Sequence, residues 1–224
     1  MTHVFLFAAY IVTALLLAVP AVLYQQAYIG GKQPKETFQH AAEGLREKPL
    51  LTAVFAGSYV LLAVLGLACK PALSHPERIG FLLLWYGVFC IAVVDFRVKK
   101  IPNLLLLILF AVRVCWITIL FLTVPDAFRS ELIPSLLGLA VGGGILLICR
   151  LLSRGGLGAG DIKIYAVLGF FLKIPDIMHV MIVSIILSAV TGLLLLLFRK
   201  ATMRSSMPMA PFILAGLTVY YIFI

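Results

Sequence analysis

The amino-acid sequence predicts an all-α fold, that of a polytopic helical membrane protein with about eight transmembrane helices and both termini outside. Hydrophobic residues make up 63% of the 224 residues and charged residues only 12%, and the mean hydropathy is +1.14. A soluble domain of this length does not need so much apolar surface. The apolar residues also form long, Leu-rich runs without charge, which favours helices over the alternating strands of a β-barrel.

Eight apolar runs are candidates to cross the ~30 Å hydrocarbon core of a membrane. They cover residues 4–24, 50–68, 79–94, 101–124, 132–152, 162–172, 177–198 and 209–224. The first is expected to be a retained helix rather than a signal peptide, because no Lys or Arg precedes it. We expect two units, namely an N-terminal pair of helices at 1–78, with a short cytoplasmic loop at 25–49, and a membrane domain at 79–224.

The basic residues predict the orientation, because Lys and Arg are retained on the cytoplasmic side of a membrane. In the loops between these runs and at the ends of the runs, thirteen of the eighteen Lys and Arg residues fall on one side and four on the other, while Arg113 falls deep within a run. The side with thirteen is therefore predicted to be cytoplasmic. This asymmetry explains the net charge of +9 without a nucleic-acid partner, and no basic stripe with interleaved aromatic residues is present.

Two aspartates differ from the other seven acidic residues, which lie in polar stretches where water can solvate them. Asp95 ends the third run, and Asp161 opens the sixth. An ionisable group at the edge of a membrane helix is costly and indicates a functional site. Both residues fall on the predicted cytoplasmic side, which supports a pair with a shared role.

Each aspartate belongs to a short motif. Asp95 is followed by a basic loop and then by Pro102 and Asn103, where proline suits the first turn of a helix because its missing N–H would have no helical partner. Asn103 could bind the loop or a substrate. The alternative is a plain turn between helices with a solvated aspartate at its rim.

The second motif is the glycine-rich string 155–163, which includes Gly158, Gly160, Asp161 and Lys163. Glycine permits positive φ angles and close backbone approach, which could let an extended substrate reach Asp161. One alternative is a flexible loop with Asp161 as a helix N-cap. A phosphate-binding loop is disfavoured, because the Gly-Lys-Ser/Thr ending is absent and an aspartate would repel phosphate.

Two carboxylates within hydrogen-bonding distance do not both ionise easily, so the pair holds one shared proton. One carboxylate can then activate water as a general base while the other protonates the scissile carbonyl. This chemistry hydrolyses a peptide without a metal ion. The sequence contains no CxxC pair, and its four histidines share no ligand spacing, so no metal site is expected.

The two motifs, in this order and spacing, resemble the prepilin peptidase family, the type IV prepilin leader peptidases of the GxGD aspartyl protease group. The stretch 207–214 resembles the segment that opens the last helix of that family, and the resemblance covers about residues 81–224. It implies a multi-pass enzyme of the bacterial cytoplasmic (inner) membrane. Such an enzyme cuts short basic leaders from prepilin-like or pseudopilin precursors at the cytoplasmic face.

The resemblance also assigns roles to residues. It implies Asp95 and Asp161 as the catalytic pair and Gly158 and Gly160 as the residues that shape the loop. Pro102, Asn103 and Lys163 are expected to shape the site or contact substrate.

The chain departs from many family members in its N-terminal third. It lacks their paired CxxC zinc motifs and the Gly-Ser-Phe-Leu-Asn-type stretch of members that methylate the new N-terminus. No cofactor is therefore expected, and S-adenosylmethionine would be needed only if the chain were also a methyltransferase.

Two functions of other classes are alternatives: a small transporter that uses the aspartates to bind a cation or relay protons, and a non-catalytic scaffold of a pilus or secretion assembly. Both aspartates lie at one boundary rather than at the midplane, which disfavours the transporter. Arg113 lies too far along its helix to pair with either aspartate, so either it faces a polar cavity or the helix is set differently from the predicted range.

Overall fold

The computed structural model describes residues 75–123, 125–153, 156–199 and 207–223, so the first two predicted helices lie outside the described residues. Within those ranges the chain forms helices and no strands, as predicted. The helices are α4 (His75–Val98), α5 (Asn103–Thr123), α6 (Pro125–Leu152), α7 (Ala159–Leu172), α8 (Asp176–Leu197) and α9 (Ala210–Phe223).

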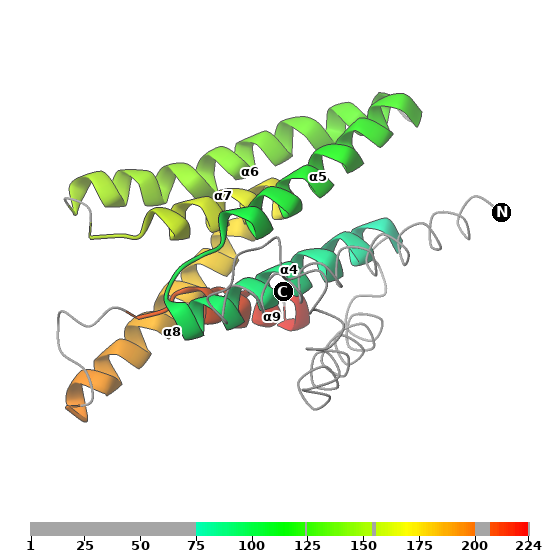
Figure 1. The fold of residues 1–224 in the computed structure, drawn as a ribbon. Coiled ribbons are helices and arrows are strands. Elements are labelled where there is room, and N and C mark those ends of the chain that lie inside the picture. The colour runs from blue at the N-terminus through cyan, green and yellow to red at the C-terminus, as the bar shows by residue number, and fades with distance from the viewer. Residues whose placement is uncertain (1–74, 124, 154–155, 200–206, 224) are drawn as a thin grey trace, which may run out of the picture.

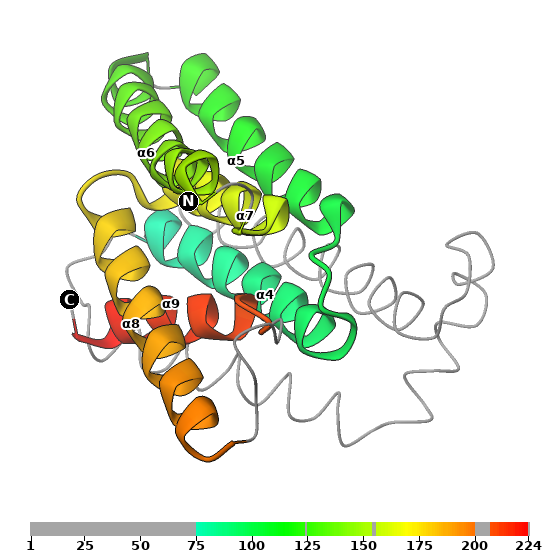
Figure 2. The same ribbon diagram turned by 90° about the vertical axis from the view of Figure 1, so that its left-hand side faces the viewer.

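The described helices form two groups (Figures 1 and 2). One group contains α5, α6 and α7, with α7 packed along α6, and the other contains α4, α8 and α9, with α9 in contact with both α4 and α8. Helix α7 also contacts α4 and α8 and so joins the groups. The buried core is apolar and includes Leu84, Val88, Leu168 and Ile213.

Three helix boundaries differ from those predicted. Helix α4 continues one turn past its apolar run, so Asp95 lies within the helix, and α6 begins at Pro125 rather than at 132. Helix α7 begins at Ala159, so Gly160 and Asp161 lie in its first turn rather than in a loop before it. Hydrophobicity marks where a helix is buried, whereas the helix itself extends as far as its backbone hydrogen bonds continue.

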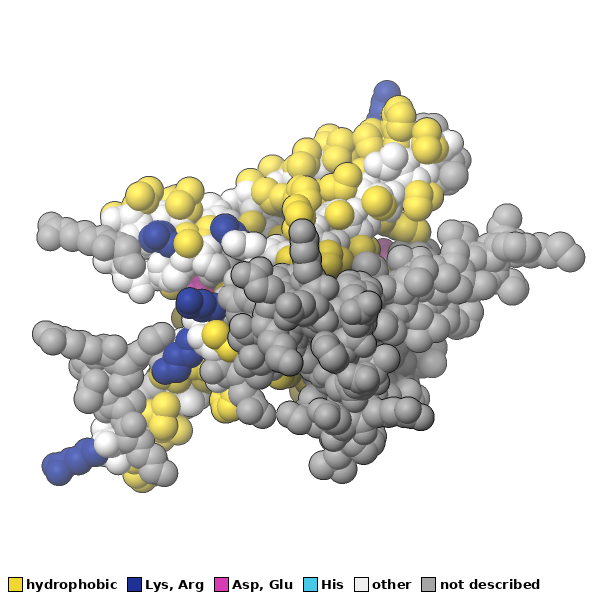
Figure 3. Space-filling model, viewed as in Figure 1, with side chains coloured by type: hydrophobic (Ala, Val, Ile, Leu, Met, Phe, Trp, Pro, Cys, Tyr) yellow, Lys and Arg dark blue, Asp and Glu magenta, His cyan; other side chains and the backbone are white. Residues whose placement is uncertain are grey.

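The described helices identify a membrane protein. Three segments are long and apolar enough to cross a bilayer: Asn103–Leu122, Asp126–Leu152 and Asp176–Leu197. Two shorter apolar segments, Gly80–Phe96 and Ala210–Phe223, accompany them. Figure 3 shows hydrophobic side chains over the outer surface of α5 and α6, a surface suited to lipid. The eight crossings and the outside termini stay predictions.

Glycine residues set how closely α6 approaches α7. A Cβ atom on Gly138 would overlap the carbonyl oxygen of Gly169 and lie 2.8 Å from the Cα of Lys173, and one on Gly142 would overlap the carbonyl oxygen of Tyr165. Small residues at both positions therefore let the two helix backbones touch. The close approach does not include Gly144, where a Cβ atom would meet no atom within 4 Å.

This geometry predicts opposite effects of alanine at two positions of one helix. Gly138→Ala is expected to destabilise the protein by about 1–3 kcal/mol, because backbone atoms of α7 must move. Gly144→Ala, the matched control, is expected to be neutral or stabilising by up to about 1 kcal/mol, because alanine favours a helix over glycine. Thermal unfolding of the detergent-purified variants measures both, and equal melting temperatures would contradict the prediction.

Candidate functional site at one end of the helices

The first predicted motif forms a tight turn between α4 and α5. The backbone N–H of Lys99 donates to the carbonyl oxygen of Asp95 at 2.8 Å, and Lys99 has a φ of 54°. This left-handed residue ends α4 and reverses the chain. Buried Pro102 then directly precedes α5, close to its predicted place in the first turn. Asp95 is thereby held in the last turn of α4, with its side chain only 5% exposed.

The second motif places Asp161 in the first turn of α7. The N-cap residue is Gly158, and its N–H donates back to the carboxylate of Asp161, three residues later, as in half of a capping box. A Cβ atom on Gly158 would lie 2.7 Å from Oδ2 of Asp161. The φ of Gly158 is −64°, so glycine is needed here for space and not for a positive φ angle.

Two contacts bring the motifs together. A Cβ atom on Gly160 would lie 3.0 Å from the Cβ of Ile101, so glycine lets the α4–α5 turn pack on α7. Nearby, the Lys163 ammonium donates a hydrogen bond to Oδ1 of Asn103 at 3.0 Å. Both side chains of that pair are exposed at the rim of the site. The predicted Asn103 and Lys163 are therefore partners of each other, which the sequence did not indicate.

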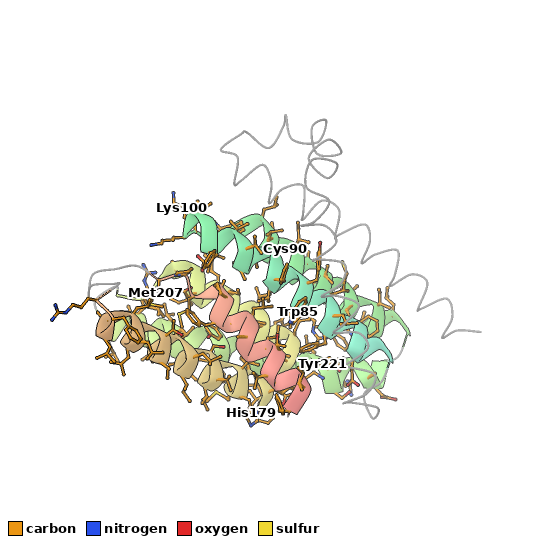
Figure 4. All side chains as sticks on the ribbon, turned by 90° about the horizontal axis from the view of Figure 1, so that it is seen from below. Trp85, Cys90, Lys100, His179, Met207 and Tyr221 are labelled. Carbon is orange, nitrogen blue, oxygen red and sulfur yellow. The ribbon has the colours of Figure 1, made fainter. Side chains whose placement is uncertain are left out.

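The start of α9 reaches the same place. Oδ2 of Asp95 accepts a hydrogen bond of 3.0 Å from the backbone N–H of Ala210, and the N–H of Met209 also donates to this carboxylate. Figure 4 shows Lys100, which follows α4, and Met207, which precedes α9, at one end of the molecule. Sequence reasoning missed these backbone donors, because a backbone N–H leaves no trace in residue identity.

The two aspartates are close enough to interact electrostatically. Asp161 lies outside the apolar part of α7, and burial together with the charge of Asp95 raises the pKa of its carboxyl group to about 6, against the lowering effect of the Gly158 N–H. A carboxyl group in this state holds its proton over a wider pH range than usual. The arrangement can therefore contain one protonated and one ionised carboxyl group.

Arg113 belongs to a separate polar cluster at the other end of the helices. Its guanidinium bonds Glu131 and Ser135 at 2.8 Å and the carbonyl oxygen of Phe170 at 3.0 Å, and Glu131 also pairs with Lys173 at 2.6 Å. Arg113 lines a cavity of about 320 Å³ there, as expected. Glu131 was predicted to be solvated by water, which is wrong, because it is held between two cations.

The expectation that no metal is needed stays a prediction. In the part of the chain that the structure describes, no three His, Cys, Asp or Glu side chains cluster so that they could hold a metal ion. The cysteines in that part are unpaired thiols, with Cys90 buried and Cys115 and Cys149 exposed.

The chain is similar in sequence to a known bacterial protein. It is 30% identical over 138 residues to the prepilin leader peptidase/N-methyltransferase of Bacillus subtilis (strain 168), an alignment that covers 59% of this chain and 51% of that protein. The chain thus spans about half the length of the curated relative it matches. No solved structure matches it.

The profile of the type IV leader peptidase family matches residues 81–193, which include both aspartates and the residues that bring their motifs together. This match extends over half of the chain. The chain therefore belongs to the type IV leader peptidase family.

Proposed function

We propose that this protein is a membrane-embedded aspartyl endopeptidase that removes the short basic leader of prepilin-like or pseudopilin precursors. The observation that carries the proposal is the convergence of Asp95 and Asp161, from helices far apart in the sequence, on one end of the helix bundle. The family of the chain and the name of its Bacillus subtilis relative support the same activity.

The reaction needs one ionised and one protonated carboxyl group. The ionised group accepts a proton from water as the water oxygen bonds to the scissile carbonyl carbon, and the protonated group gives its proton to the carbonyl oxygen. The resulting gem-diol collapses as the first group returns its proton to the amide nitrogen and the second takes one back from a hydroxyl group. The C–N bond breaks, and the pair again holds one proton.

The site is proposed to face the cytoplasm from the bacterial inner membrane. Most Lys and Arg side chains visible in Figure 3 gather at the end that carries the α4–α5 and α6–α7 connections, as expected for a cytoplasmic end. The hydrophobic helix of a precursor could lie in the lipid beside the exposed apolar faces of the enzyme, with its leader at the site. Methyl transfer is not part of this proposal.

The first prediction concerns the two aspartates. Asp95→Asn and Asp161→Asn are each expected to lower the cleavage rate by about 10²–10⁴-fold, because an amide cannot exchange the required proton. The assay is cleavage of a precursor with a basic leader, a glycine and a hydrophobic helix, with the products identified by mass spectrometry. Asp126→Asn, in the exposed first turn of α6, is the matched control, and near-normal cleavage by either site variant would overturn the proposal.

Gly158 provides a second prediction, about the position of the carboxylate. Gly158→Ala is expected to lower kcat by about 10-fold to 100-fold, because the new Cβ atom would displace the carboxylate of Asp161. Gly156→Ala is the matched control, since its Cβ atom would make only ordinary contacts, from 3.4 Å. Equal rates for the two variants in the same assay would show that the carboxylate tolerates displacement.

A third prediction follows from the raised pKa of Asp161. Between its ordinary value of 3.8 and about 6, the folded protein holds more protons than the unfolded chain, so the free energy of unfolding falls as the pH rises. Asp161→Asn removes this decrease of the free energy of unfolding with pH. Its melting temperature relative to wild type is expected to increase by a few degrees between pH 4 and pH 7. A constant difference in melting temperature across this range would contradict the prediction.

A further inference from the structure

The carboxylate of Asp95 is bound by the start of a helix that comes much later in the chain. Asp95 is 5% exposed, and its Oδ2 accepts the Ala210 N–H at 3.0 Å, with the Met209 N–H as a second donor. Because the first N–H groups of a helix lack partners within the helix, they are free to bind an anion. Here they bind a buried side chain of the candidate site.

Contacts along the rest of α9 fix the direction of these donors. The indole N–H of Trp85 donates to Oγ1 of Thr218 at 2.8 Å, and the rings of Phe81 and Tyr221 stack with their centroids 3.9 Å apart. Both contacts join α9 to α4, the helix that carries Asp95. Gly216 lies directly against α8 on another side. The register of α9 along α4 is therefore set, and so is the position of its first N–H groups.

The two aspartates receive unequal support for a negative charge. Hydrogen-bond donors stabilise an ionised carboxylate, whereas burial away from water opposes its ionisation, so the number of donors matters most for a buried group. Asp95 has two backbone donors, whereas Asp161 has one, from Gly158. The carbonyl end of α4 disfavours a charge on Asp95, but a direct hydrogen bond to an ionised group has a larger effect than a helix dipole.

We propose that the N–H groups of Met209 and Ala210 hold Asp95 as the ionised member of the pair, so that Asp95 is the general base and Asp161 the proton donor. This inference rests on the proposed peptidase function and assigns a separate role to each aspartate within it. Asp95 takes the proton from water, and Asp161 gives its own proton to the carbonyl oxygen. The N–H groups of Met209 and Ala210 exchange no proton in the reaction and act by stabilising the charge on Asp95.

Other ionisable groups near the pair can be named element by element. Lys99 and Lys100 lie in the α4–α5 turn, and Lys163 on α7 is bonded to Asn103. Tyr165 lies one turn after Asp161. Helix α9 contributes no ionisable side chain among residues 207–212, so its influence on the pair comes through the backbone donors.

The test removes one of these donors without changing a side chain. Cell-free translation can replace Ala210 with lactic acid, which converts its amide N–H into an ester oxygen. The same replacement at Ala215, in the middle of α9, is the matched control. The pH dependence of kcat/KM is measured for wild type and both esters, on the precursor described above, in the same lipid nanodiscs.

The limb of the pH profile that moves identifies the ionised residue. If Asp95 is the base, loss of the Ala210 N–H moves the acidic limb to higher pH by about one unit and leaves the alkaline limb in place. If Asp161 is the base, Asp95 is ionised only in the state in which both carboxyl groups are ionised. Loss of the Ala210 N–H then destabilises only that state, so the alkaline limb moves instead. That result would overturn the proposal, as would an unchanged profile or a folded ester variant inactive at every pH. The Ala215 ester is expected to keep both limbs of wild type.

Failure of the proposed function would look different. In that case wild-type protein would not cleave the precursor, or cleavage would survive Asp95→Asn or Asp161→Asn. Cleavage that both substitutions abolish, together with a profile that does not move as stated, would leave the peptidase standing and reject only the assignment of the base.

Discussion

The hydrogen bonds to the carboxylate of Asp95 constrain much of the structure. A buried carboxylate is costly unless donors satisfy it, and its donors come from the start of α9, 115 residues further along the chain. Helix α9 must therefore begin at the level where α4 ends. That requirement places α4 and α9 side by side and leaves their apolar faces to be covered by α8 and α7.

Glycine residues meet the second constraint, which is to bring α7 close enough for Asp161 to join the same site. Gly138 and Gly169 allow the α6 and α7 backbones to touch, and Gly160 admits the α4–α5 turn. Gly158 leaves room for the carboxylate to fold back over its own N-cap. Gly158 and Gly160 therefore provide space for the carboxylate and for the α4–α5 turn rather than unusual backbone angles.

The opposite ends of the helices are fastened by charge as well as by the close backbone packing of Gly138 on Gly169 and Lys173. Arg113, Glu131 and Lys173 come from α5, α6 and the residue after α7, and they form one connected set of ion pairs. Such a cluster is costly to break when it is largely removed from water. It holds these helices together on the side away from the aspartates, so the two polar regions of the bundle are separate.

The sequence by itself determined the helical membrane fold, because long apolar runs without alternation fit helices in lipid rather than the strands of a barrel. It also singled out Asp95 and Asp161, because acidic groups beside such runs are costly. It also placed the family motifs. Only the tertiary structure decided which groups surround the carboxylates: the N–H groups of α9, the contact of Gly160 with Ile101, and the pairing of Arg113 with Glu131. These depend on how distant helices pack, and neither backbone donors nor packing distances are encoded in the identity of a single residue.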